Sequence, residues 1–132
     1  MSLDRKAYTT WLRRAAAALA LLAPLGAAQA ADDWTVEERM TFTASSVLLV
    51  ADWAQTRQIA RNAQMYRETN PIIGAHPSMG RVNAYFLSAL LLNYAIGSSL
   101  DRGWRTAWFI GVQSVEASVV QRNLNIGLTL SF

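Results

Sequence analysis

The spacing of apolar and polar positions along the chain predicts helices. After residue 31, neither Pro nor Gly occurs until Pro71, so a long helix can run through this part of the sequence. Thr35 and Glu38 have the spacing of a capping box, in which each side chain accepts a hydrogen bond from the other residue's backbone N–H. The first helix is therefore predicted over residues 36–63.

Two further helices are expected after a loop that is rich in Pro and Gly. Residues 82–100 contain no charged residue and form the most apolar segment of this region, so we predict a second helix over residues 79–100. A turn at Asp101-Arg-Gly103 separates it from a third helix, predicted over residues 104–121. The predicted fold class is all-α, a single-domain bundle of about three helices.

The end of the chain does not follow the helical pattern. In the tail, residues 123–132, apolar residues alternate with polar or small ones at Leu124, Ile126, Leu128, Leu130 and Phe132. This period of two is typical of a strand, and the terminal aromatic resembles the last strand of outer-membrane barrel proteins. A barrel of about eight strands would use nearly the whole chain. We predict instead a short strand or extended tail that pairs with another chain.

Residues 1–30 have the composition of a cleaved signal peptide. A basic head precedes an apolar stretch at residues 15–28, and Ala28-Gln29-Ala30 offers small residues for cleavage before Ala31. A retained anchor helix is the alternative. The chain has 12 Lys and Arg and 9 Asp and Glu residues, and the leader holds four of the basic and one of the acidic ones, so the rest is neutral. Nothing basic is left to bind nucleic acid.

Lipid is the solvent that we expect around the three helices. The chain has no Cys, so an exported domain of this length has no disulfide to stabilise it. Export of the leader places residue 31 outside, and after one crossing the loop with Arg61, Arg67 and Arg81 lies inside, as the positive-inside rule requires. The predicted location is the inner membrane of a bacterial cell envelope, with the lipid bilayer as a partner. The periplasm and the outer membrane are the alternatives.

A polar centre is predicted within the apolar helices. Asp52 and Glu116 are carboxylates in segments apolar enough for lipid, where an unpaired charge is costly. Gln55 and Thr56 follow Asp52 by about one helical turn, and Arg57 is the next residue. These residues form either a proton-carrying or ligand-binding site or a polar clasp between helices, and we take the clasp as the simpler interpretation.

A second group of candidate residues lies in the loop between the first two helices: Glu68, Asn70, Pro71 and His76. Pro71 after Asn70 predicts a turn. The one His of the chain has no second ligand at a metal-binding spacing, so no metal or cofactor is predicted. The chain also lacks a nucleophile motif and a phosphate-binding Gly loop, so no catalytic residue is assigned and an enzyme is the less favoured interpretation.

Small residues line one side of the third helix. At about 100° per residue, they form a single stripe of the kind that lets two helices approach closely, at Ala107, Gly111, Ser114 and Ser118. Glu116 lies on the opposite side. A helix with two such faces needs more neighbours than a three-helix monomer provides, so we predict a homo-oligomer or a larger membrane complex.

Two motifs resemble a known pattern. Asp52-Trp-Ala-Gln-Thr-Arg57 and Glu68-Thr-Asn-Pro-Ile-Ile-Gly74, followed by His76-Pro77, are similar to an uncharacterised group of small bacterial and phage-associated envelope proteins. The resemblance implies a compact helical membrane protein and no established reaction.

We therefore expect a small exported integral membrane protein that acts as a non-enzymatic accessory or assembly subunit of the cell envelope. One alternative is a membrane-embedded enzyme or a proton- or ligand-binding protein that uses Asp52, Glu68, His76 and Glu116. The other is an outer-membrane β-barrel or a holin-like pore.

Overall fold

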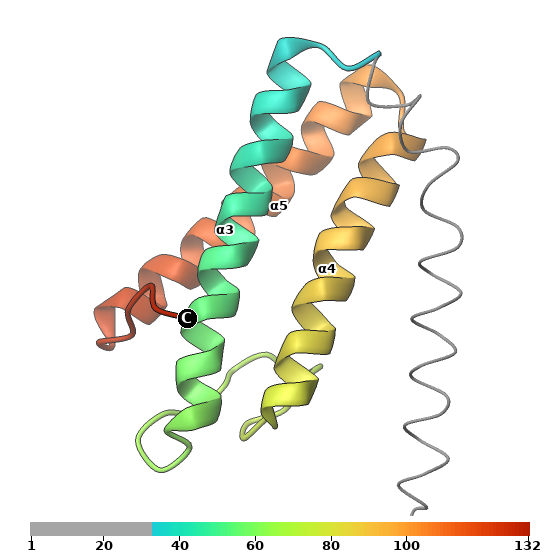
Figure 1. The fold of residues 1–132 in the computed structure, drawn as a ribbon. Helices are drawn as coiled ribbons and strands as arrows, with labels where there is room; N and C mark the ends of the chain where they lie inside the picture. The colour runs from blue at the N-terminus through green and yellow to red at the C-terminus, as the bar shows by residue number, and fades with distance from the viewer. Residues whose placement is uncertain (1–32) are drawn as a thin grey trace, which may run out of the picture. The chain divides into compact units, whose positions relative to one another are not determined.

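The computed structural model describes residues 33–132, and residues 35–132 form one compact unit. This described part contains three helices and no strand: α3 (Val36–Arg61), α4 (Met79–Ser99) and α5 (Arg102–Asn125). In Figure 1, α4 runs back beside α3, and α5 crosses α3 at an angle. The prediction of an all-α bundle of three helices is confirmed. The predicted leader, residues 1–30, lies outside the described residues.

The helix starts follow from local capping. At the start of α3, Thr35 N donates to Glu38 Oε2 at 2.7 Å, and Glu38 N donates to Thr35 Oγ1 at 3.2 Å, which is the predicted capping box. Ser78 caps α4 in the same way, because its hydroxyl accepts a hydrogen bond from Arg81 N at 3.3 Å. Both helices therefore begin where the sequence predicts.

The third helix is longer than predicted at both ends. It begins at Arg102, directly after Asp101 in an extended conformation, and it continues to Asn125. The predicted end at residue 121 was too early, because the alternating pattern of residues 123–132 was interpreted as an extended tail. Asn123 of this segment is helical and is buried against α3. Gly127, with a φ of 94°, ends the helical path, since L-residues rarely adopt this conformation.

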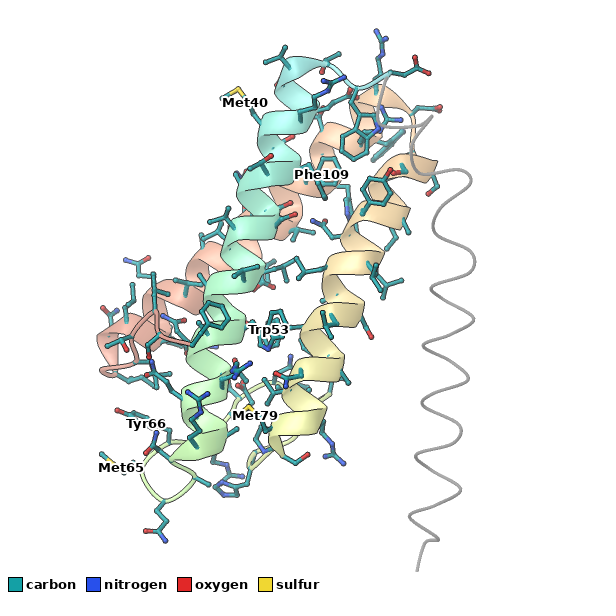
Figure 2. The ribbon with its side chains drawn as sticks, viewed as in Figure 1. Met40, Trp53, Met65, Tyr66, Met79 and Phe109 are labelled. Carbon is teal, nitrogen blue, oxygen red and sulfur yellow. The ribbon has the colours of Figure 1, made fainter. Side chains whose placement is uncertain are left out.

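Aromatic side chains fill the apolar part of the interior. Phe109 of α5 is fully buried and lies against Phe42 of α3, with ring centroids 5.3 Å apart. Trp53 lies between α3 and α4 (Figure 2) and stacks on Phe86 at 6.3 Å. Burying a side chain of this size contributes about 1.5–3 kcal/mol. Gly97 of α4 makes room for the Phe109 ring, because a Cβ atom at that position would overlap it.

Several polar side chains lie in the interior beside the apolar core, and large apolar side chains lie exposed on the outer faces. The buried polar and charged residues are Glu38, Ser45, Asp52, Gln55, Thr56, Asn93 and Asn123. The exposed large apolar residues of the helices are Val36, Met40, Val47, Leu87, Leu91, Leu92, Trp104, Ile110, Val115 and Leu124. None of the described helices combines the length and the apolarity that crossing a membrane requires. The three predicted spans therefore stay a prediction.

The tail folds back along α3. The Gln58 side chain donates to Thr129 O at 2.9 Å and accepts from Thr129 N at 3.1 Å. One side-chain amide therefore binds the backbone N–H and C=O groups of Thr129 that a neighbouring strand could otherwise bind. Phe132 meets Trp53 edge-on, with ring centroids 6.2 Å apart, and Arg57 lies over the Phe132 ring at 5.9 Å. The described residues form no strand here, and the tail after Gly127 lies outside any helix, as the extended alternative predicts. Pairing of the tail with another chain stays a prediction.

Candidate functional site

Asp52 and Glu116 meet between α3 and α5, as the predicted polar centre requires. Asp52 is only 8% exposed, and its carboxyl is hydrogen-bonded to that of Glu116. Asp52 Oδ1 also accepts from Asn123 Nδ2 at 3.1 Å and from Thr56 Oγ1 at 3.4 Å. Within the described residues, no Arg forms an ion pair with either carboxyl. The pair is therefore held by hydrogen bonds and not by an opposite charge.

The surroundings favour the protonated form of this pair. Burial, followed by the negative charges of Glu116 and Glu68, raises the pKa of Asp52 to about 7. Burial also raises the pKa of Glu116, while the hydrogen bond from Asp52 lowers it. A hydrogen bond between two carboxyl groups needs one proton, and burial, which raises the pKa of both groups, favours a proton on the pair as a whole.

The remaining predicted members of the centre lie at different distances from the pair. Gln55 is fully buried one turn further along α3, where its amide donates to Val120 O of α5 at 3.3 Å. Its Oε1 has no hydrogen-bond partner, and neither has Glu116 Oε2. Arg57 turns toward α4 and donates to Asn83 Oδ1 at 3.4 Å. The polar centre thus contains four of the five predicted residues, and Arg57 belongs to the α3–α4 contact.

The loop motif mainly shapes the loop. The Glu68 carboxylate accepts from the N–H groups of Thr69 and Asn70, both at 2.7 Å, and Asn70 Oδ1 accepts from Ile72 N at 2.9 Å across Pro71. Gly74 closes the turn at a φ of 82° and donates to Asn70 O at 3.1 Å. These contacts explain the spacing of Glu68, Asn70 and Pro71 without a ligand.

Of the candidate residues in the loop, Glu68 acts on the polar centre and His76 has no contact with it that the structure shows. The charge of Glu68 acts on Asp52, so the loop contributes a third carboxylate to its electrostatics. His76 is exposed. Within the described residues, no three His, Cys, Asp or Glu side chains are grouped as a metal ion would need.

Asn93 forms a second polar bridge that the sequence analysis did not identify. Its amide donates to Ser45 Oγ of α3 at 2.9 Å, and its carbonyl accepts from Trp108 Nε1 of α5 at 3.0 Å. One side chain of α4 therefore joins all three helices. The sequence could have indicated this bridge, because Asn93 is a polar amide within the uncharged, apolar residues 82–100.

A buried ion pair closes the end of the bundle where α3 begins. Arg105 of α5 donates to Glu38 Oε1 at 3.1 Å, and the two side chains are 11% and 2% exposed. Arg105 also donates to Gly97 O at 2.8 Å and to Leu100 O at 2.7 Å, which satisfies carbonyls at the end of α4. Burial opposes the ionisation of Glu38, but the Thr35 N–H and the Arg105 charge outweigh it and lower the pKa of Glu38.

The small-residue stripe of α5 faces outward in the described chain. Its four residues are all exposed: Ala107, Gly111, Ser114 and Ser118. A Cβ atom at Gly111 would meet nothing within 4 Å. An open hollow of about 350 Å³ lies beside it, between Ala107 and Val115. Glu116, on the other side of the helix, meets its partner within the monomer.

Comparison of the chain with protein-family models, curated proteins and solved structures gave no match. The site is therefore interpreted from its own geometry. It contains two carboxyls that share a proton, amide and hydroxyl donors that fix their orientation, and a nearby third carboxylate. Chemically, such a group can hold and release a proton.

Proposed function

We propose that the protein is a small, non-enzymatic subunit of the bacterial cell envelope that assembles with further copies of itself. The observation that carries this proposal is the number of large apolar side chains that lie exposed on the outer faces of the helices, around an interior that holds several polar side chains beside its apolar core. Water is a poor solvent for such an exterior, and neighbouring lipid or protein is a better one.

The outer face of α3 gives the clearest example. Val36 and Met40 are 75% and 67% exposed, and Figure 2 shows Met40 pointing away from the bundle. With Val47 they line a shallow hollow of about 460 Å³. A second hollow of about 470 Å³ shares Thr43 and Val47 with the first, so the two form one continuous surface. Each such side chain gains about 1.5–3 kcal/mol when it leaves water, so a contiguous row favours a partner.

The outer face of α5 supports assembly with a second copy. Along this face the small side chains leave the backbone open to close approach, and exposed Trp104, Ile110 and Val115 flank them. A helix from another copy can pack closely on such a stripe. Asn123 and Trp108 of α5 bind to α3 and α4, so the face with the small residues is turned outward and exposed, where an intermolecular contact can form.

Lipid is the proposed surrounding for the rest of the exterior. Leu87, Leu91 and Leu92 lie exposed along α4, which is the most apolar of the three helices. The helices would contact lipid as one bundle, with their polar side chains turned toward one another. The inner-membrane location and the resemblance to small envelope proteins remain part of this proposal.

Assembly is tested with a pair of glycine variants. A side chain fits in open space at both Gly111, on the stripe, and Gly80, at the start of α4. Gly111→Leu should reduce the mass of the full chain in mild detergent toward that of a monomer, while Gly80→Leu should leave the mass unchanged. A wild-type monomer, or equal behaviour of the two variants, would contradict assembly through α5.

The surroundings are tested separately by washing membranes from cells that express the full chain. The proposal predicts that the protein stays with the membranes in high salt and is released by detergent. Release by osmotic shock or by salt alone would rule out lipid as the cover of the α4 face.

A further inference from the structure

One end of the bundle carries a cluster of exposed positive charges. It is the end with the loop between α3 and α4, and its four exposed Arg residues, here called the basic end, come from this loop and from each of the three helices: Arg61, Arg67, Arg81 and Arg122. Two of them contact the loop, since Arg81 donates to Ile73 O at 3.3 Å and Arg122 donates to Thr69 Oγ1 at 3.0 Å. Folding therefore brings Arg122 of α5 to a loop residue that lies 53 positions away in the sequence.

The basic end has no acidic partner within the described residues. None of its Arg side chains forms an ion pair there. Glu68 is the one acidic residue of the sequence between residues 53 and 100, and its carboxylate accepts from the N–H groups of Thr69 and Asn70 instead. Both Arg residues that contact the loop bind neutral oxygens, and a guanidinium has five N–H donors, so most of these donors are left for an external anion.

The same loop presents two large apolar side chains to the outside. Met65 is 76% exposed and Ile72 is 74% exposed, and Figure 2 shows Met65 pointing away from the bundle. The turn that holds Ile72 is fixed, because its N–H donates to Asn70 Oδ1 at 2.9 Å and the next residue, Ile73, is only 2% exposed. One Ile therefore anchors the turn to the bundle, and the other is displayed beside the Arg residues.

The surface of an anionic lipid bilayer matches both features of this end. A headgroup phosphate accepts hydrogen bonds from the planar fork of an Arg side chain. The boundary between headgroups and acyl chains takes up apolar side chains such as Met65 and Ile72. A dissolved anion would neutralise the charges but leave these two side chains in water, so the combination favours a bilayer.

We infer that the basic end, together with Met65 and Ile72, binds the headgroup region of an anionic phospholipid bilayer. The inference rests on the proposed function, which takes lipid as a neighbour of the bundle, and it adds the chemical class of lipid and the end of the bundle that recognises it. Each Arg near such a surface contributes about fivefold to binding, the equivalent of about 1 kcal/mol.

A dye at residue 72 tests this inference in the full chain. The chain has no Cys, so Ile72→Cys provides a single position for a dye whose emission depends on polarity. The labelled chain is reconstituted into phosphatidylcholine vesicles in which the fraction of phosphatidylglycerol, an anionic lipid, is raised stepwise. The emission should shift to shorter wavelength as this fraction rises, and about 1 M salt should reduce the shift by screening the charges.

Two exposed Arg residues at opposite ends of α5 provide matched variants of the labelled chain. Arg122→Gln should need about fivefold more phosphatidylglycerol for the same shift, since it removes one charge from the basic end. Arg102→Gln should behave like the parent. Arg67→Gln repeats the test at a side chain without a hydrogen bond in the described chain, in case Arg122→Gln disturbs the loop.

An emission that does not depend on phosphatidylglycerol, or equal effects of Arg122→Gln and Arg102→Gln, would overturn the inference. Reversal of the shift by inorganic phosphate, at an ionic strength where chloride has no effect, would identify a free-anion site and overturn it as well.

Flotation of the same vesicles separates this inference from the proposed function. A chain that floats with pure phosphatidylcholine but does not respond to phosphatidylglycerol would refute the inference alone. A chain that floats only with phosphatidylglycerol present, and leaves the vesicles in high salt, would support the inference and refute lipid as the cover of the α4 face.

Discussion

Replacing Arg105 with Leu should destabilise the bundle more than any other single change of an Arg in the described chain. The guanidinium of Arg105 joins three helices, because it pairs with Glu38 of α3 and caps the carbonyls of Gly97 and Leu100 at the end of α4. Leucine retains part of the apolar contact but none of these hydrogen bonds. Glu38 would remain buried without its opposite charge.

The expected loss is about 3–5 kcal/mol of unfolding free energy, the usual cost when one partner of a buried ion pair is removed. The smaller stabilisation energies typical of surface ion pairs do not apply, since the Glu38 side chain is 2% exposed and the Arg105 side chain is 11% exposed. The pKa of Glu38 is lower in the folded chain than in the unfolded chain, where it is about 4.3. The ionised carboxylate therefore stabilises the fold above about pH 4.3, and this contribution is lost as the pH falls through the folded pKa. Arg105→Leu should weaken that dependence.

Reversible urea unfolding of the full chain at neutral pH, followed by circular dichroism, measures the loss. Arg102→Leu is the control, because Arg102 is exposed at the start of the same helix and its replacement should change stability by no more than about 0.5 kcal/mol. A double-mutant cycle with Glu38→Gln isolates the pairwise energy. A loss of unfolding free energy below about 1 kcal/mol for Arg105→Leu would refute the claim that this ion pair is a main stabilising contact of the bundle.

Three further changes test the packing and the polar contacts. Gly97→Ala should cost about 1–3 kcal/mol in thermal unfolding, since its Cβ overlaps a buried ring. Gly80→Ala, where the added Cβ meets open space, should change the stability by no more than about 0.5 kcal/mol, and equal effects would contradict the packing. Asn93→Ala should cost about 1–3 kcal/mol, because the Trp108 N–H loses its acceptor and the Ser45 hydroxyl loses its donor, and a neutral result in urea unfolding would contradict the bridge. Glu68→Gln should lower the pKa of Asp52 by removing a negative charge that acts on it, so the infrared carbonyl band of the protonated Asp52 carboxyl should disappear at a lower pH than in the wild type; an unchanged pH midpoint would show that Glu68 does not act on Asp52.

The helices were predictable because their signals are local. Thr35 and Glu38 define a helix start by spacing alone, and the capping box is present as predicted. The proximity of Asp52 and Glu116 was also predictable, because a carboxylate within an apolar segment is costly unless it finds polar partners. Their direct contact is the physical outcome of that requirement.

The other parts of the site depend on which face of each helix points into the bundle. The sequence shows that Ala107 and Gly111 share one face of α5, but not that this face is exposed in the monomer. It places Arg57 next to the polar centre, but the side chain turns to α4. Asn123 was missed because the alternating pattern assigned residues 123–132 to the tail, whereas α5 continues to Asn125. Tertiary packing decides among these outcomes.

The central claim is that lipid and further copies of the chain, and not water, cover the outer faces of this bundle. Phase partitioning of the full chain with a detergent that separates from water on warming tests this claim most directly. The account predicts that the protein enters the detergent phase. Recovery of folded protein from the aqueous phase would contradict it.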